Sequence, residues 1–301
     1  MSKSKKLVFF GSGDLGLSSL KTLEAEFEIV LVATKPKSEN HKGKMPVYDY
    51  CLEKGLNLIT PINKKELQDQ LLSLGYLSDL GVAVDYGIII SQAVIDSFSL
   101  GIVNSHFSLL PAWRGADPIT FPILAGQNQS GVTFMMIDRG MDTGKIIASF
   151  PLNLSPDETQ ESLTRKLLSL SDQKIVSIVQ SIFNRKNKLI DQSGYLITYS
   201  RMLYKPEREF NLNKPASLLE REIRAFQTWP KSKLNILGIN CTIKNATSAE
   251  RLNLSLGEIK IVDNRILVGC GRGSHLEIIA LQPDGKKTMP AADFIRGYSR
   301  N

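Results

Sequence analysis

The sequence KLVFFGSGDLGLSSLKTLEAEFEIVLVAT, residues 6–34, decides the fold. An apolar run, KLVFF, ends at a glycine-rich turn, and a segment with leucines at helical spacing leads to a second apolar run, EIVLVAT. Apolar runs joined by an amphipathic helix are typical of a strand–helix–strand unit in a buried parallel sheet. The alternation continues to residue 106, so we predict an α/β domain on a doubly wound, Rossmann-like, mostly parallel sheet.

The turn GSGDLG places Gly11, Gly13 and Gly16 in the spacing of a dinucleotide-binding motif. Such a motif also needs an acidic residue at the end of the second strand to bind the ribose, and a Thr-Lys-Pro sequence stands there instead, at residues 34–36. We therefore interpret the turn as a tight structural connection, and NAD(P) binding stays as the alternative.

The periodicity of the following segments predicts further helices and strands. We expect helices at 46–54, 64–77, 92–98, 118–126 and 159–184, and strands at 56–60, 79–90, 101–106, 131–138 and 145–154. In a sheet of this kind, ligands bind at the carboxyl ends of the strands. Polar residues at those ends are therefore the first candidates for a site.

Beyond residue 200 the pattern changes. Residues 201–215 are charged and contain two prolines, which is typical of a linker, and from Leu234 short β-prone runs alternate with Gly and Asp-Asn turns. Such runs without intervening helices predict a small β-barrel. We therefore expect a first domain at 1–200, a linker at 201–215 and a second domain at 216–301.

The positive charge lies in the last third of the chain. The formal net charge is +7, and residues 201–301 contain 17 Lys and Arg against 10 Asp and Glu, while residues 1–200 are balanced. This asymmetry favours a polyanionic partner for the second domain, although a solubilising surface would give the same charge. The lysine-rich segment 35–44 is either a solvated loop or an arm that contacts a phosphate backbone.

Several classes of protein are disfavoured. The three cysteines, Cys51, Cys241 and Cys270, are far apart and include no CxxC pair, so we expect neither disulfides nor a metal site. No apolar run approaches the roughly 18 residues of a membrane span, and the N-terminal apolar run is too short for a signal peptide. We therefore expect a cytoplasmic protein without a membrane partner.

The candidate site lies in NSHFSLLPAWRGADPITFPILAGQNQSGVTFMMIDRGMDTG, residues 104–144. Asn104 and His106 are two residues apart at a strand end, so they project to the same side. We find neither a nucleophile elbow nor metal-ligand spacing, which leaves direct transfer to a substrate nucleophile. Asn104 and His106 would stabilise an oxyanion, and Asp142 would orient His106 or relay a proton. A single histidine of this kind can also be structural.

These residues match the pattern of a known family. NSHFSLLPAWRGADPI and GVTFMMIDRGMDTGKI resemble the folate-dependent formyltransferases, which carry an N-x-H-x-S-L-L-P element and a later Asp before Thr-Gly. The resemblance implies 10-formyltetrahydrofolate as formyl donor and catalytic roles for Asn104, His106 and Asp142. It also implies a folate site at Ser108, Leu109, Leu110 and Pro111, with a wall formed by Tyr86, Gly87, Ile88, Ile89 and Ile90.

The sequence of the C-terminal half narrows the choice of formyl acceptor. LEREIRAFQTWP and LQPDGKKTMPAADFIRGY resemble the family members that formylate methionyl-tRNA, in which an OB-like barrel helps to hold the tRNA. The resemblance implies initiator methionyl-tRNA as the partner, and we expect a monomeric enzyme without a metal. We expect tRNA contacts at Lys35, Lys37, Lys42, Lys44 and Arg114. A sugar-nucleotide N-formyltransferase and a non-catalytic RNA-binding relative stay as alternatives.

Overall fold

The computed structural model describes residues 5–37, 43–193, 196–250 and 254–298. The chain forms two compact units, the first made of Met1–Pro118, Gln129–Asn153 and Arg165–Ser200, and the second of Ile119–Asn128, Leu154–Thr164 and Arg201–Asn301. Residues 119–128 and 154–164, which we expected in the first domain, thus group with the second unit. The division into a catalytic and a tRNA-contacting domain stays a prediction.

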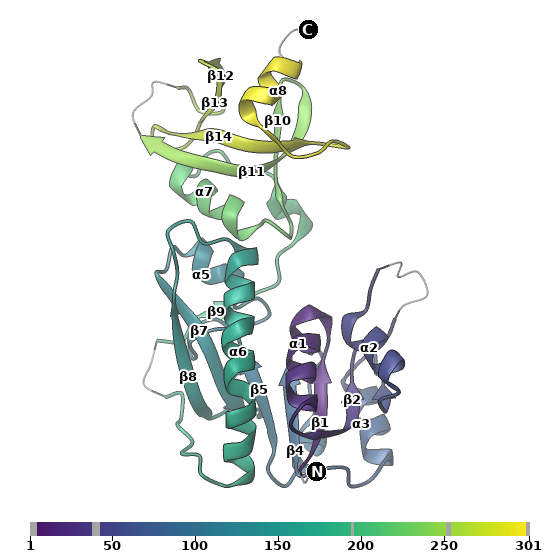
Figure 1. Cartoon of the computed structure of the whole chain (residues 1–301). Coiled ribbons are helices and arrows are strands. Elements are labelled where there is room, and N and C mark those ends of the chain that lie inside the picture. Colours follow the sequence, from purple (N-terminus) through teal and green to yellow (C-terminus); the bar gives the residue numbers. More distant parts are fainter. Residues whose placement is uncertain (1–4, 38–42, 194–195, 251–253, 299–301) are drawn as a thin grey trace. The chain divides into compact units, whose positions relative to one another are not determined.

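The first unit is built on a seven-stranded sheet in the order β3-β2-β1-β4-β5-β7-β8 (Figure 1). β1 to β5 run parallel, and β7 and β8 continue the sheet antiparallel. The doubly wound, mostly parallel sheet that we predicted is therefore confirmed. The strands are β1 (Lys6–Gly11), β2 (Glu28–Ala33), β3 (Leu58–Ile59), β4 (Leu80–Val84), β5 (Ile102–His106), β7 (Gln129–Met136) and β8 (Ile146–Asn153).

Helices cover both faces of this sheet. On one face lie α1 and the long helix α6 (Figure 1). Asp172 of α6 accepts hydrogen bonds from Ser18 and Ser19 of α1, at 2.6 and 2.7 Å. On the other face, α3 and α4 pack with Val8 and Phe10 of β1 in one apolar cluster. The helices are α1 (Gly13–Glu24), α2 (Pro46–Lys54), α3 (Lys64–Ser73), α4 (Gln92–Asp96), α5 (Thr120–Leu124) and α6 (Gln160–Phe183).

The strand that we predicted at 79–90 is shorter in the structure. β4 ends at Val84, because Asp85 (φ 51°) and Gly87 (φ 71°) adopt left-handed backbone angles that no strand can contain. Residues 86–90, which were expected to end this strand, instead form a connection to α4, in which the Ile89 side chain is 71% exposed. Residues 86–90 have the apolar composition of a strand but do not adopt its extended backbone.

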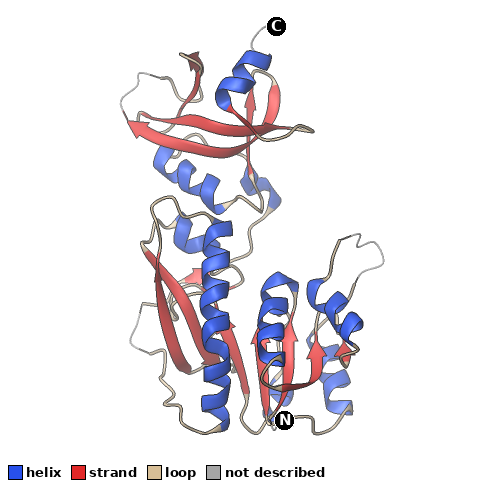
Figure 2. Cartoon of the chain, in the orientation of Figure 1, coloured by secondary structure: helices blue, strands red, loops and turns tan. Residues whose placement is uncertain are grey.

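The second unit contains a six-stranded antiparallel sheet in the order β10-β11-β14-β13-β12, with β15 paired to β14. Figure 2 shows its strands together with the helices α7 and α8. The predicted small barrel-like β domain is confirmed. Its elements are α7 (Ala216–Ala225), β10 (Ser232–Ile236), β11 (Ile239–Glu250), β12 (Ile259–Val262), β13 (Arg265–Gly269), β14 (Ser274–Pro283), β15 (Met289–Pro290) and α8 (Ala291–Tyr298).

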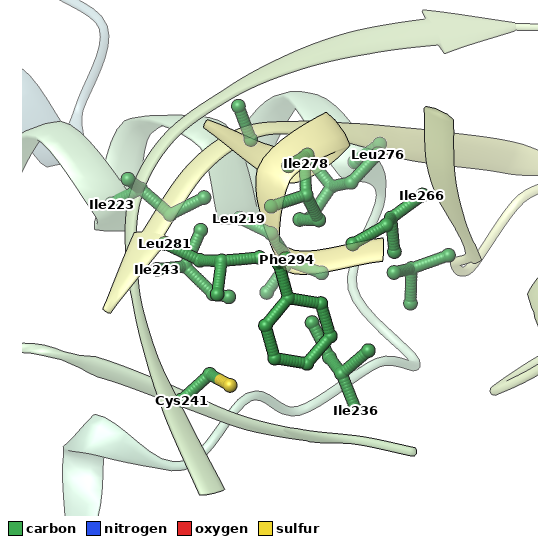
Figure 3. Packing of buried hydrophobic residues seen from close by; sticks show 14 of the residues in the cluster. Leu219, Ile223, Ile236, Cys241, Ile243, Ile266, Leu276, Ile278, Leu281 and Phe294 are labelled. Atoms are coloured by element: carbon green, nitrogen blue, oxygen red, sulfur yellow. The ribbon is translucent and has the colours of Figure 1, made fainter. Parts of the chain in front are cut away.

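The core of the second unit joins both helices to the sheet. Leu219 and Ile223 from α7 and Phe294 from α8 are buried among apolar side chains of the strands (Figure 3). The segment 201–215, which we expected to be a linker, also belongs to this unit. It contains a short 3₁₀ helix, Lys205–Arg208, and the carbonyl oxygen of Leu203 accepts a 3.0 Å hydrogen bond from the indole of Trp229.

Neighbouring leucines of α7 test this core. Leu219 is fully buried, whereas Leu218 is 37% exposed on the same helix. We expect Leu219→Ala to lower the free energy of unfolding by about 2–5 kcal/mol, because it leaves a cavity that the sheet cannot close. Leu218→Ala should cost less than about 1 kcal/mol. Urea denaturation of both variants measures the difference, and equal losses would contradict the assigned packing.

Candidate active site

Strand β5 positions the first two candidate residues. Asn104 pairs in register with Ala83 of β4 and Met135 of β7, so β5 is held along both edges. Side chains alternate along a strand, and Asn104 and His106 therefore share one face of the sheet. Ser105 points to the other face, where its hydroxyl lies 2.8 Å from that of Ser171 in α6. The predicted same-side placement of Asn104 and His106 thus follows from the pairing of β5.

His106 is almost completely enclosed and has a polar atom near each ring nitrogen. Its Nε2 lies 3.1 Å from the carbonyl oxygen of Trp113, and its Nδ1 lies 3.7 Å from Oδ2 of Asp142. A carbonyl oxygen only accepts, so Nε2 carries a proton, and a neutral ring then turns its Nδ1 lone pair toward the carboxylate. Burial lowers the pKa of His106, while Asp142 and the Trp113 carbonyl act in the opposite direction.

Asp142 lies on the connection between β7 and β8 and is held by a backbone donor. Its Oδ2 accepts a 2.8 Å hydrogen bond from the Gly115 N–H, and its own backbone is left-handed, with φ 55°. Gly115 has φ 116°, and a Cβ on it would lie 2.3 Å from the Ser200 carbonyl oxygen. Only glycine therefore allows this backbone N–H to reach the carboxylate.

Asn104 completes the group that we predicted. It is half-buried, and within the described residues its side-chain amide forms no hydrogen bond. A free amide on the strand face of a buried imidazole, with a half-buried carboxylate beside that ring, supplies a hydrogen-bond donor, an imidazole and a proton acceptor. The structure places His106 and Asp142 together, and Asn104 on the same face of β5 as His106.

The residues expected to hold folate differ in exposure. Ser108 is fully buried, and its hydroxyl donates to the Ala112 carbonyl at 2.5 Å. Leu110 is also buried and donates its N–H to the Thr133 hydroxyl. Tyr86 lies in the core beside α3 and α4, and its hydroxyl has no hydrogen-bond partner in the described structure. Burial raises the pKa of Tyr86. Leu109, Ile88 and Ile89 remain accessible.

The residues expected to contact the tRNA also differ in exposure. Lys35 and Lys44 are exposed, and Lys37 is exposed with its Nζ 4.0 Å from the Asp49 carboxylate. Lys42 lies outside the described residues. Arg114 is 6% exposed, and its Nε and Nη2 donate to Oε1 of Gln192 at 3.1 and 2.7 Å. Arg114 is therefore engaged in the interior, and a contact between this residue and the tRNA stays a prediction.

Three participants of the site escaped the sequence analysis. They are the Trp113 carbonyl oxygen, the Gly115 N–H and the side chain of Gln192. The first two are backbone atoms, which no residue type reports. Gln192 stands in a polar loop 78 residues from Arg114, and only a contact map connects the two.

Neither a metal site nor a membrane span is found in the described part of the chain. None of its His, Cys, Asp and Glu side chains gather in threes in a way that could hold a metal ion. Its helices are each too short or too polar to cross a bilayer.

Comparison with known proteins assigns the family. Residues 5–179 match the family model described as formyl transferase, and residues 202–299 match the one described as formyl transferase, C-terminal domain. The chain belongs to the formyl transferase family. The resemblance that we stated from the motif at residues 104–144 is thus confirmed, and the chain is an enzyme of this family.

One relative in the formyl transferase family covers nearly the whole chain. A methionyl-tRNA formyltransferase from Hahella chejuensis is 34% identical over 304 residues, which cover 99% of this chain and 95% of that protein. An N-formyltransferase from Helicobacter canadensis, solved with folinic acid and dTDP-3-aminofucose, has a TM-score of 0.71 at 20% identity and covers 91% of this chain and 98% of its own.

A third relative is more distant. HypX from Aquifex aeolicus, solved with tetrahydrofolic acid, has a TM-score of 0.61 at 15% identity, and the match covers 99% of this chain and 48% of that one. At identities this low, the two solved structures show the shared fold alone.

The contact between His106 and Asp142 makes a prediction for titration. The carboxylate raises the pKa of His106 against the effect of burial. We therefore expect Asp142→Asn to lower the pKa of His106 further, because the amide has a similar shape but no charge. The chain has three histidines, so NMR titration of the ring nitrogens resolves the change. An unchanged or raised pKa would show that the carboxylate does not act on the ring.

Proposed function

We propose that the protein transfers the formyl group of 10-formyltetrahydrofolate to the amino group of initiator methionyl-tRNA. The observation that carries the proposal is the placement of a buried His106, in contact with the Asp142 carboxylate, on the strand face that also presents Asn104. The full-length relative from Hahella chejuensis, a methionyl-tRNA formyltransferase, supports the acceptor.

Each catalytic side chain has a role that matches its surroundings. The donor supplies an activated formyl carbonyl. The amide of Asn104 has no competing partner in the described structure and donates to the carbonyl oxygen as charge develops there. His106 adds to that stabilisation through its charge when the ring is protonated, because the N–H of the neutral ring is bonded to the Trp113 carbonyl. Asp142, at 3.7 Å from Nδ1, orients the ring and takes up the proton that the amino group loses, directly or through water. The bond between the formyl carbon and N10 of the folate then breaks, and N10 takes up a proton as tetrahydrofolate leaves.

The residues after β4 fit a folate. Ile89 leaves an apolar side chain 71% exposed, which is a surface that a flat ring system would cover. In the described structure, the backbone N–H and C=O groups of residues 86–90 form no hydrogen bonds. Because Ala83 pairs with Asn104, the end of β4 lies beside the catalytic strand. This connection would supply apolar contact and free polar groups next to Asn104.

Within the folate site, the two parts of our predicted set have different tasks. Leu109 is half-buried and would contact the ligand, together with Ile88 and Ile89. Ser108 and Leu110 shape the turn from inside, because their polar groups bond to Ala112 and Thr133. We propose the accessible members as the folate contacts.

The second unit supports a polyanionic acceptor. Lys231, Lys233 and Lys244 lie close enough to repel one another, and partial burial together with the other two lysines lowers the pKa of Lys244. Lys233 pairs with Asp284, so the local charge is only partly compensated. A cluster of cations held against their own repulsion is a surface that a phosphate backbone would stabilise.

We also propose that the enzyme acts as a monomer in the cytoplasm. The three free, buried cysteines are compatible with a reducing compartment. A sugar-nucleotide acceptor is the second candidate, because an N-formyltransferase from Helicobacter canadensis shares the fold. The basic second unit favours the tRNA over this alternative.

A formylation assay with several acceptors tests the function. We expect the purified protein to convert methionyl-tRNA to formyl-methionyl-tRNA with 10-formyltetrahydrofolate, and Asp142→Asn to lower kcat about 100-fold or more while folate binding is kept. Product analysis by chromatography and folate binding by calorimetry measure the two effects. Formylation of an amino sugar nucleotide with none of the tRNA would refute the proposed acceptor.

Lysine substitutions test the contacts with the tRNA. We expect Lys37→Ala with Lys44→Ala, and separately Lys231→Ala with Lys244→Ala, to raise KM for the tRNA about 3–10-fold. Each lost phosphate contact should also reduce the slope of log affinity against log salt by about 0.7–0.9. Steady-state kinetics at several salt concentrations measure both quantities.

The matched control removes the same charge elsewhere. Lys186 and Lys188 are exposed beyond the end of α6, and their replacement by Ala also removes two positive charges. If this control raises KM as much as the two test pairs do, the effect comes from net charge alone and the assigned contacts are wrong.

A further inference from the structure

The carboxylate of Asp142 is attached to a turn whose left-handed backbone is unfavourable by itself. Asp142 has φ 55°, which for a residue with a side chain costs about 1–3 kcal/mol and persists only where neighbours enforce it. Two residues later, Gly144 packs so closely that a Cβ on it would lie 1.7 Å from the Met136 carbonyl oxygen. The turn from 142 to 144 therefore needs a partner that fixes its carbonyl groups.

Gln192 is that partner. Its Nε2 donates to the carbonyl oxygens of Asp142 and Gly144, at 2.9 and 2.7 Å, and so uses both amide hydrogens on one turn. The residue is 5% exposed, so water does not compete for these bonds. The two bonds fix the direction of the peptide units that follow Asp142 and Gly144, and thereby constrain the direction in which the Asp142 side chain leaves the backbone.

The other end of the same amide holds a second loop. Oε1 of Gln192 accepts from Nε and Nη2 of Arg114, and Arg114 lies between two residues of the site. The carbonyl oxygen of Trp113 accepts a hydrogen bond from His106, and the N–H of Gly115 donates one to the Asp142 carboxylate. Gln192 thus adds a second link between the 113–115 loop and the 142–144 turn, which the bond from Gly115 to Asp142 already connects.

Only an amide of this length satisfies both loops. A carboxylate would keep the bonds to Arg114 but would face two carbonyl oxygens without a hydrogen to donate. A thioether of similar length would fill the space and donate or accept almost nothing. Among the described residues Arg114 forms no ion pair, so its guanidinium is held in the interior by the neutral amide of Gln192.

We propose that Gln192 is a positioning residue of the reaction, which holds the Asp142 carboxylate against His106 through the 142–144 turn and Arg114. The catalytic step in which it acts rests on the proposed formyl transfer, but the geometry that it maintains does not. Gln192 touches neither the imidazole nor the carboxylate, so its loss moves these groups apart and leaves their chemistry intact.

Two substitutions in the full-length chain test this role. Gln192→Glu keeps the size and the bonds to Arg114 and removes both donors to the turn, and Gln192→Met removes every bond while keeping the length. We expect each to lower kcat about 100-fold, the effect of a displacement near 1 Å, with KM for the tRNA changed less than about twofold. Gln173→Glu is the matched control, because Gln173 is exposed on α6 and bonds only to Ser169.

A second readout separates positioning from stability and from the assay itself. In Gln192→Met we expect the pKa of His106, measured by NMR, to fall by about half a unit or more, because the carboxylate no longer stays near the ring. This readout needs no substrate, so it stands even if the wild-type protein formylates another acceptor. Urea denaturation reports the folded fraction. If one of the two Gln192 variants is unfolded in the assay buffer, the other variant decides the test.

The outcomes divide clearly. A folded Gln192→Glu with wild-type kcat, or a folded Gln192→Met with an unchanged pKa of His106, overturns the proposal. A loss of kcat that only follows the unfolded fraction also overturns it, because Gln192 would then be structural. If wild-type protein gives no formyl transfer while the pKa of His106 shifts as expected, the proposed function fails and the positioning role remains.

Discussion

Strand β5 is hydrogen-bonded along both edges, to parallel β4 and antiparallel β7, and the site depends on this double pairing. A strand held on two sides cannot slip by one residue without exchanging all of its side chains between the two faces of the sheet. The register therefore places Asn104 and His106 on one face and directs Ser105 to α6 on the other. The loops that carry Trp113, Gly115 and Asp142 are built around this pair.

The electrostatics of the site follow from its burial. The imidazole of His106 is enclosed, so its charged form is disfavoured and its pKa is lowered, although the nearby Asp142 carboxylate acts in the opposite direction. That carboxylate lies on a left-handed turn, and the distance between the two groups is set by backbone atoms and by Gln192. The conformation of the 142–144 turn therefore influences the pKa of His106, because it sets the position of the Asp142 carboxylate.

The sequence predicted the parts of the molecule whose signals are local. KLVFF and EIVLVAT indicated buried parallel strands, and Asn104 and His106 were two residues apart on a predicted strand, so their shared face needed no structure. The predicted strand at 79–90 was too long. The apolar residues after Val84 follow Asp85, whose left-handed backbone cannot be recognised from composition. The interior position of Arg114 was not visible either, since an arginine in a polar loop looks like a surface residue until its partner Gln192 is known.

By itself, the sequence determined the α/β class, the change of pattern after residue 200 and the residue types of the candidate catalytic group. These depend on periodicity and on motif spacing, which are properties of neighbouring residues. Tertiary structure alone decided that Gly115 bonds to Asp142 across 27 positions and that Arg114 bonds to Gln192 across 78. Such contacts depend on where loops from different strands meet, and packing of the whole sheet sets those positions. The residues that align the site are therefore visible only in the folded chain.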